Sequence, residues 1–183
     1  MSDELVIRHC APTLASLKTG SLFSSAFSSR AEMLSSVRAL NERLQGKGLR
    51  VLPMRYRAGI GLIYIYRPGK LSRDLRDADA SRLLRDCGYP GGNENRCIRC
   101  LIDRLNARQD FPHEIGLFLG YPPVDVEGFM RHPCDCKCSG CWKVYGDVDA
   151  AQRTFARYRK CSDLYWKLWK SGKSMEYLTV AEH

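Results

Sequence analysis

The strongest constraint on the fold is a short apolar stretch, GIGLIYIY, at residues 59–66. It is far shorter than the roughly 18–20 apolar residues of a membrane-spanning helix, and its Ile and Tyr residues favour a β-strand. A second strand-like stretch begins near Val51, and the segment RAGIG lies between the two, so together they predict a β-hairpin. Pro53 has no backbone N–H, which indicates that the first strand lies at a sheet edge or starts late.

Helical patterns alternate with further strand-like stretches along the chain. Ser29 and Glu32 have capping-box spacing, an apolar stripe follows, and Gly46 or Gly48 ends this helix. The N-terminal residues predict either a helix interrupted at Pro12 or a strand that leads into a helix started by that proline. The other expected helices cover residues 72–86, 95–108 and 124–132 and a long C-terminal stretch capped by Asp147 or Asp149; the other expected strands cover residues 19–27, 114–122 and 141–147.

This alternation predicts an α/β or α+β fold, with about five strands in one sheet and several packing helices. A length of 183 residues is that of a single globular domain over residues 1–183, and 44% apolar and 10% aromatic residues are typical of globular chains. The acidic start MSDELVIRHC lacks the basic flank and apolar core of a secretion signal. We therefore expect a cytoplasmic protein with no membrane partner.

The chain is basic, with 29 Lys and Arg against 20 Asp and Glu, and a formal net charge of +9. A positive field favours anionic partners, although charge alone does not define a nucleic-acid-binding protein. No phosphate-binding glycine loop, zinc-protease helix motif, nucleophile elbow or calcium loop is present in the sequence. Whether the chain is an enzyme stays open.

Nine cysteines in a reducing compartment are unlike a disulfide framework, and nine is an odd number. Two pairs have the C-x-x-C spacing of a structural zinc site. The expected zinc ligands are Cys97, Cys100, Cys138 and Cys141, with Cys134 and Cys136 as alternates. Two alternatives stay open, namely buried or incidental thiols, and thiol–disulfide exchange at Cys97, which two arginines flank.

Three stretches resemble one uncharacterised domain-of-unknown-function family, found chiefly in clostridia and other anaerobic Firmicutes. They are RHCAPTLASLKTGSLFS at residues 8–24, FPHEIGLFLGYPPVDVEGF at 111–129, and CWKVYGDVDAAQRTFARYRKC at 141–161. The resemblance spans nearly the whole chain and implies a bacterial cytosolic single domain, whose relatives accompany flavodoxin and ferrous-iron uptake genes; it implies no established activity. The cysteine crowding at 134–138, and Cys141 where the family usually has Tyr, are particular to this chain.

Cys10 and His113 both fall in stretches that carry this resemblance. A thiol and an imidazole can form a nucleophilic dyad, with Glu114 orienting the ring, which predicts a thiol-dependent enzyme. The same two groups are also good ligands of iron or haem. The alternative is structural, with Cys10 packed in the core and His113 at the entrance of a strand.

Our leading interpretation is a cleft between the Cys10 region and the strand expected after His113. The cleft is expected to bind a small anionic ligand or an iron-linked cofactor, of which haem is the most specific version. The residues expected to contact that ligand are His9, Lys18, Tyr121 and the arginines of the hairpin.

A third hypothesis is a zinc-stabilised module that binds nucleic acid or another partner through its basic C-terminal helix. Arg153, Arg157 and Lys160 share one helical stripe, which Lys167 and Lys170 continue. An exposed Trp142 or Tyr145 would then stack on bases. The alternative is an ordinary solvated helix face.

Overall fold

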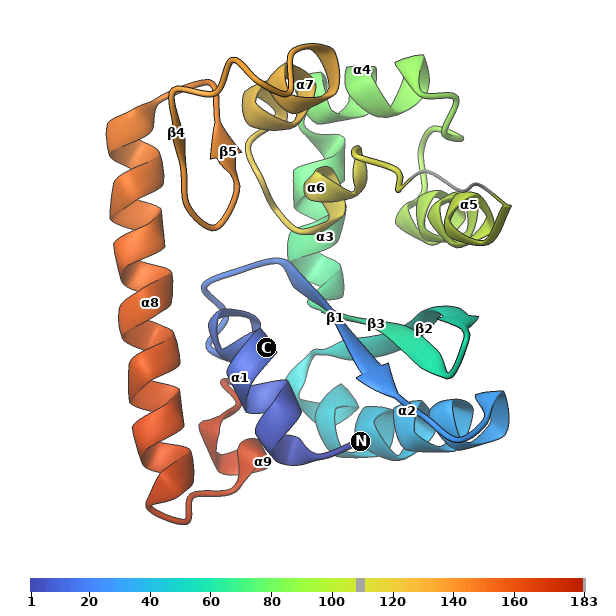
Figure 1. The fold of residues 1–183 in the computed structure, drawn as a ribbon, viewed down its shortest axis with the longest axis vertical. Helices are drawn as coiled ribbons and strands as arrows, with labels where there is room; N and C mark the ends of the chain where they lie inside the picture. The colour runs from blue at the N-terminus through green and yellow to red at the C-terminus, as the bar shows by residue number, and fades with distance from the viewer. Residues whose placement is uncertain (108–110, 183) are drawn as a thin grey trace. The chain divides into compact units, whose positions relative to one another are not determined.

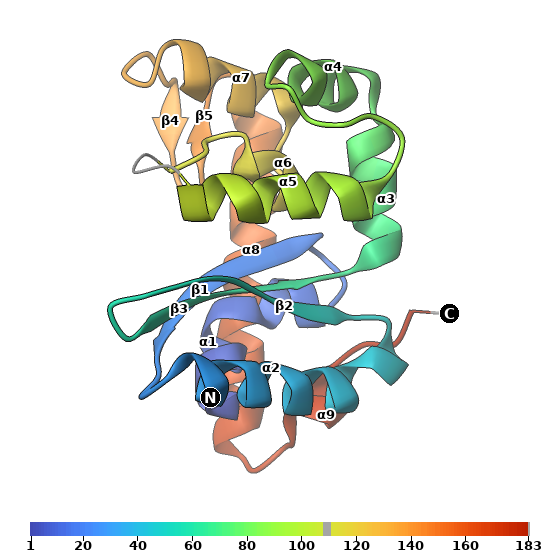
Figure 2. The same ribbon diagram turned by 90° about the vertical axis from the view of Figure 1, so that its right-hand side faces the viewer.

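The computed structural model describes residues 1–107 and 111–182 and divides the chain into two compact units (Figures 1 and 2). Unit 1 consists of Met1–Pro68 and Tyr158–His183, and unit 2 consists of Gly69–Arg157. The architecture is mixed α+β. The expectation of one domain over residues 1–183 stays a prediction beside these two units. No helix in the described part of the chain combines the length and apolarity needed to cross a bilayer.

Unit 1 is built on a three-stranded antiparallel sheet. Its strands are β1 (Gly20–Ala26), β2 (Arg50–Arg57) and β3 (Ile60–Tyr66), in the order β1-β3-β2. The predicted hairpin is confirmed, since β2 pairs with β3 around Ala58 and Gly59. Both residues have positive φ, 50° and 76°, as a type I′ two-residue hairpin turn requires.

The prediction that Pro53 marks an edge strand is also confirmed, because β2 pairs only with β3 in the described sheet. The register shifts between Pro53 and Arg55, which interrupts the edge with a bulge. The side chain of Asn41 pairs with Val51, accepting from its backbone N–H at 2.8 Å and donating to its carbonyl at 2.7 Å. The proline, the bulge and the side-chain amide of Asn41 together protect this edge from pairing with another chain.

The helices of unit 1 cover one face of this sheet, as Figure 2 shows for α1 and α2. Helix α1 runs unbroken through Pro12, so the strand alternative for the N-terminus is wrong, and so is the expected interruption of the helix at Pro12. Ser29 accepts from the backbone N–H of Glu32, which confirms the predicted cap of α2. The described helices with residues in unit 1 are α1 (Asp3–Leu14), α2 (Arg30–Leu44), the short 3-10 helix η1 (Gln45–Lys47), the C-terminal part of α8 (Val148–Lys170) and α9 (Met175–Leu178).

Arg67, which directly follows β3, is a fully buried arginine. The last carbonyls of a helix have no partner within the helix, and its guanidinium supplies donors to those of α1. Nε donates to Thr13 O at 2.7 Å, and Nη2 donates to Leu14 O at 2.7 Å and to Val180 O at 2.8 Å. Nη1 also lies 3.6 Å from Glu182. This arginine of the hairpin segment therefore joins the end of α1 to the C-terminal tail, inside unit 1.

Unit 2 is mainly helical and contains a separate two-stranded sheet. Its elements are α3 (Pro68–Arg76), α4 (Ala78–Asp86), α5 (Glu94–Ala107), α6 (Ile115–Phe118), α7 (Pro123–Arg131), β4 (Cys138–Ser139), β5 (Lys143–Val144) and the start of α8. The predicted helix over 95–108 corresponds to α5, with residue 108 outside the described residues, and the helix over 124–132 corresponds to α7. Asp147 accepts from the N–H of Ala150 at 3.0 Å and so caps α8 as predicted.

Three predicted features of unit 2 are wrong. The five strands do not form one sheet, since the described strands form one sheet of three and another of two. The helix expected over 72–86 is divided into α3 and α4 at Asp77, whose carboxylate caps α4. The strand expected over 114–122 is the short helix α6 followed by turns. Its apolar run is too short to show whether its period is that of a helix or a strand.

Candidate ligand-binding site: an aromatic pocket in unit 2

Unit 2 contains a pocket of about 340 Å³ whose walls are mainly apolar. Eight of the lining residues come from the stretch between Phe111 and Phe129, and two come from the β4–β5 hairpin. They are Phe111, His113, Ile115, Gly116, Tyr121, Asp125, Val126, Phe129, Trp142 and Lys143. An apolar concavity with a few polar groups is the usual form of a small-molecule site.

The walls of the pocket are aromatic rings in direct contact. Tyr121 stacks on Trp142, with ring centroids 4.9 Å apart, and Trp142 meets Phe155 edge-on at 4.5 Å. The imidazole of His113 lies edge-on to Phe129, with centroids 4.8 Å apart. Such offset and edge-on arrangements are the favoured geometries of aromatic pairs.

Asp125, in the first turn of α7, fixes the hairpin wall of the pocket. Its carboxylate is 3% exposed and accepts three hydrogen bonds. Oδ2 accepts from the indole Nε1 of Trp142 at 2.7 Å, and Oδ1 accepts from the backbone N–H groups of Tyr145 and Gly146 at 2.7 and 2.8 Å. A buried carboxylate with three donors is both satisfied and directional, so it sets the position of the Trp142 ring.

Two glycines permit the close packing behind these walls. A Cβ on Gly116 would lie 2.8 Å from a methyl of Val126, and one on Gly128 would overlap the ring of Tyr145. Helix α7 therefore approaches its neighbours at a distance that only glycine allows.

The polar groups of the pocket converge on one ring. Lys143 Nζ lies 5.3 Å from the centroid of Phe129, the ring that His113 also contacts, and donates to Pro133 O at 2.7 Å. Burial raises the pKa of Tyr121 to about 12, so its hydroxyl is a neutral donor, which hydrogen-bonds to the carbonyl of Cys141. The pocket thus offers a cation and an imidazole beside a mainly apolar slot, whose carboxylate, Asp125, is already engaged by three donors.

The predicted site residues fall in both units. His113 and Tyr121 line the same pocket of unit 2. Glu114 is 5% exposed, and its Oε1 accepts from Tyr89 at 3.0 Å and from Arg104 at 3.2 Å. These partners join the start of α6 to α5 and to the loop between α4 and α5. The idea that Glu114 orients the His113 ring stays a prediction, and the bonds of Glu114 give it a structural role.

Cys10, His9 and Lys18 belong to unit 1. Cys10 lies within α1, not at a turn, and is fully buried. Burial raises the pKa of its thiol to about 12, so the nucleophilic thiolate is scarce near neutral pH. His9 lies on the exposed side of α1 and stacks on Phe23, with centroids 5.7 Å apart. The Cys10–His113 dyad stays a prediction, and the burial of Cys10 weighs against it.

The predicted zinc ligands lie on two elements of unit 2. Cys97 is buried in α5, and its Sγ–H donates to Pro90 O at 3.1 Å. Cys138 begins β4, and Cys141 is exposed in the loop of the hairpin. Within residues 1–107 and 111–182, no three His, Cys, Asp or Glu side chains gather where they could hold a metal ion. The zinc hypothesis therefore gains no support.

Sequence reasoning did not identify Phe129, or the part that Trp142 and Asp125 play in the pocket. A signal was present, because Asp125, Val126 and Phe129 have the three- and four-residue spacing that places side chains on one side of a helix. The nucleic-acid hypothesis required an exposed Trp142 or Tyr145 to stack on bases, whereas the ring of Trp142 packs between Tyr121 and Phe155.

The fold and this pocket define an α+β protein with an aromatic-lined cavity beside a short hairpin. The chain belongs to the family described as Protein of unknown function (DUF3793), whose model matches residues 6–179. This match confirms the predicted membership of an uncharacterised domain-of-unknown-function family. A search of curated proteins and a search of solved structures each gave no match.

Proposed function

We propose that this protein binds a small, flat, largely apolar ligand that carries an anionic group, in the aromatic pocket of unit 2. The observation that carries the proposal is the convergence of two distant stretches on one cavity. Residues 111–129 and the hairpin residues Trp142 and Lys143 together line about 340 Å³, which is within the usual size range of small-molecule pockets.

The shape and chemistry of the walls support a flat ligand. Tyr121 and Trp142 form one stacked wall, and Phe129 with the edge-on His113 forms another part of the lining. A planar ring system buries apolar area against these side chains without leaving polar groups unsatisfied.

The anionic group is argued from Lys143 and His113. Both contact the ring of Phe129, so an ammonium and an imidazole lie near the same part of the pocket, where they can meet a carboxylate of a bound ligand. Hydrogen bonds between charged partners are roughly twice as strong as neutral ones, so the part of the pocket beside Lys143 and His113 favours an anionic ligand over a neutral one.

Calorimetric titration with 2-naphthoate and with its uncharged analogue 2-naphthamide tests the proposal. We expect saturable binding of both, with the carboxylate about tenfold tighter, since hydrogen bonds to charged groups contribute about 1.5–3 kcal/mol. Lys143→Gln should remove the preference while amide binding persists, and Phe129→Ala should weaken both.

The matched control is Lys137→Gln, since Lys137 also donates to a backbone carbonyl, that of Gly146 at 2.8 Å, but does not line the pocket. It should bind like the unsubstituted protein. Absence of binding by both probes would exclude the proposal.

The haem version of the proposal, expected from the sequence, has a separate test. Haem is a planar apolar ring with carboxylate groups, and His113 supplies an imidazole at the pocket. A titration with hemin should then give a sharpened Soret band that His113→Ala abolishes. An unchanged hemin spectrum would exclude haem while leaving the smaller ligands to the naphthoate test.

A further inference from the structure

The net positive charge of the chain belongs almost entirely to unit 1. Unit 1 contains fifteen Lys and Arg against seven Asp and Glu, a surplus of eight, whereas unit 2 contains fourteen against thirteen. A surplus so unevenly distributed indicates that an anionic partner meets unit 1. The pocket of the proposed function lies in unit 2, so this inference is independent of it.

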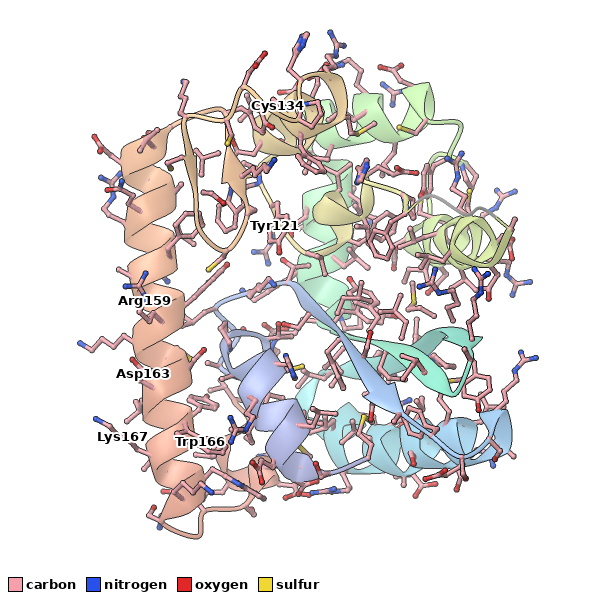
Figure 3. All side chains as sticks on the ribbon, in the orientation of Figure 1. Tyr121, Cys134, Arg159, Asp163, Trp166 and Lys167 are labelled. Carbon is pink, nitrogen blue, oxygen red and sulfur yellow. The ribbon has the colours of Figure 1, made fainter. Side chains whose placement is uncertain are left out.

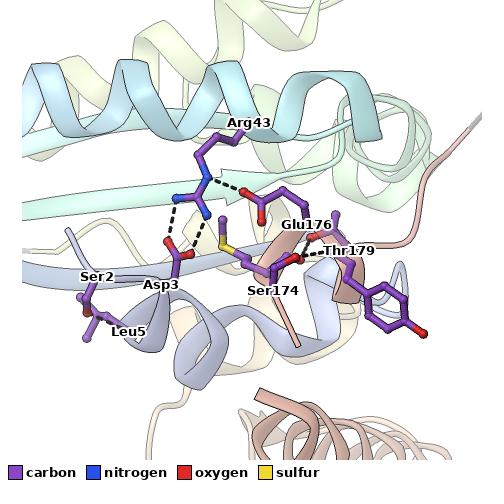
Figure 4. Close-up of polar contacts among 9 residues, drawn as sticks. Ser2, Asp3, Leu5, Arg43, Ser174, Glu176 and Thr179 are labelled. Atoms are coloured by element: carbon purple, nitrogen blue, oxygen red, sulfur yellow. Dashed lines mark hydrogen bonds and ion pairs between the residues drawn. The ribbon is translucent and has the colours of Figure 1, made fainter. Parts of the chain in front are cut away.

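Most cations of unit 1 are exposed at its surface. Among the described residues, ion pairs join Asp3, Glu4, Glu176 and Glu182 to three cations of this unit, Arg8, Arg43 and Arg67. Figure 4 shows that Arg43 alone holds two of these acids, Asp3 at 2.5 Å and Glu176 at 2.5 Å. Internal pairing therefore removes more negative than positive charge from the surface.

At one end of unit 1 the cations alternate with aromatic rings. The guanidinium of Arg8 lies 3.9 Å from the centroid of Trp166, and Lys170 Nζ lies 4.7 Å from the same ring. One turn further along the chain, Lys173 Nζ lies 4.9 Å from the ring of Tyr177, which is 70% exposed. We call the following five residues the cation–aromatic face: Arg8, Trp166, Lys170, Lys173 and Tyr177. Figure 3 shows Trp166 on the α1 side of α8, with Lys167 directed to the other side.

We propose that the cation–aromatic face of unit 1 binds single-stranded nucleic acid. Lys170 and Lys173 provide contacts for backbone phosphates, and the exposed ring of Tyr177 provides a stacking surface for a base. The contacts with Trp166 hold Arg8 and Lys170 in place, so their charges are positioned before any partner arrives.

The acidic residues close in the chain to these cations and rings are mostly paired: Glu176, which directly precedes Tyr177, pairs with Arg43 at 2.5 Å. Glu4 is already paired with Arg8 at 3.0 Å, and Asp163 is exposed on α8. The surface of α2 and β2 is also basic. The large apolar residues exposed near it are aliphatic, namely Leu34 on α2 and Ile60 beside the hairpin turn. Those aliphatic side chains offer no ring for stacking, which favours the α8–α9 end as the site.

The test is fluorescence anisotropy of a short fluorescein-labelled oligothymidylate with the full chain, over about 50 to 200 mM salt. We expect the logarithm of affinity to fall linearly with the logarithm of salt. The double variant Lys170→Gln/Lys173→Gln should reduce that slope by about 1.4, because each phosphate contact on a single strand contributes about 0.7. Tyr177→Ala should weaken binding by about fivefold or more, at unchanged slope.

The matched control is Arg38→Gln/Arg57→Gln, which removes two exposed charges of unit 1 away from these rings. It should leave the slope nearly unchanged. Equal losses in both double variants, or an unchanged affinity of Tyr177→Ala, would overturn the assignment of this face. Equal affinity for a duplex of the same length would overturn the preference for single strands. Binding to vesicles of phosphatidylcholine and phosphatidylserine, without binding to the oligonucleotide, would overturn the proposal in favour of a membrane surface.

Discussion

Replacing Asp125 by asparagine tests how the pocket wall is held. The carboxylate accepts two backbone N–H groups at Oδ1 and the Trp142 indole N–H at Oδ2. Asparagine keeps one acceptor oxygen and puts an NH₂ group where the other was. In one orientation the NH₂ group faces the indole donor, which leaves one donor without an acceptor. In the other orientation it faces the two backbone donors, which leaves two donors without an acceptor.

The expected cost of Asp125→Asn follows from this geometry. One buried donor loses its acceptor, at about 1–3 kcal/mol, and the free energy of unfolding falls by that amount. Asp125→Ala leaves all three donors without an acceptor and should cost about 3–9 kcal/mol by the same reasoning. Trp142→Phe keeps an aromatic ring but removes the indole donor, so Asp125→Asn should cost about 1 kcal/mol less in that background.

The assay is urea unfolding followed by circular dichroism, applied to the four proteins of this double-mutant cycle. Circular dichroism is preferred because Trp142→Phe removes one of the three tryptophans that fluorescence would report. A coupling energy of zero would show that the bond between Asp125 and Trp142 contributes nothing, and would refute this account of the pocket wall.

Three further predictions concern a buried thiol, a close approach and an ion pair. Since the pKa of Cys10 is raised to about 12, iodoacetamide near pH 8 should leave it unlabelled in the native chain while labelling the exposed Cys141, as peptide mass spectrometry would show. Gly128→Ala should lower the free energy of unfolding by about 1–3 kcal/mol through overpacking, whereas Gly69→Ala, with no atom near the added methyl, should be neutral or slightly stabilising in urea unfolding. Hydrogen bonding to Arg43 holds the pKa of Glu176 below its usual value, so the ion pair stabilises the fold fully near neutral pH and loses this contribution on acidification. The stability difference between the unsubstituted protein and Glu176→Gln should therefore shrink below about pH 4.5 in parallel thermal melts. A difference that stays constant with pH would contradict this.

The elements with strong local signals were the predictable ones. The capping residues of α2, the turn before β3 and Pro53 on the edge strand each act through neighbouring residues, so the sequence pattern was sufficient to identify them. Residues 114–122 were mistaken for a strand because their burial comes from tertiary packing on all sides, which removes any periodic pattern. The number of strands in one sheet was overestimated because residues 114–122 are not a strand and because β5 pairs with β4 in a separate sheet.

The site was predictable only in part. His113 and Tyr121 were identified within the stretch that lines the pocket, but the sequence could not show that the hairpin residues 142–143 complete it. That contact depends on Asp125, a single buried carboxylate that joins α7 to residues 142–146. Cys10 was favoured because it falls in a stretch that carries the family resemblance, yet the helix directs its neighbour His9 outward and Cys10 into the core. Neighbours along a helix point about 100° apart, so adjacency in sequence is no evidence for a shared site.

The most direct test of the proposed pocket is to locate a bound ligand by nuclear Overhauser contacts. With 2-naphthoate at saturation, its ring protons should show cross-peaks to the ring protons of Phe129 and Trp142, and the His113 ring signals should shift. The same spectra of Phe129→Ala should lose these cross-peaks. Saturable binding with contacts only to residues outside this pocket would contradict the account.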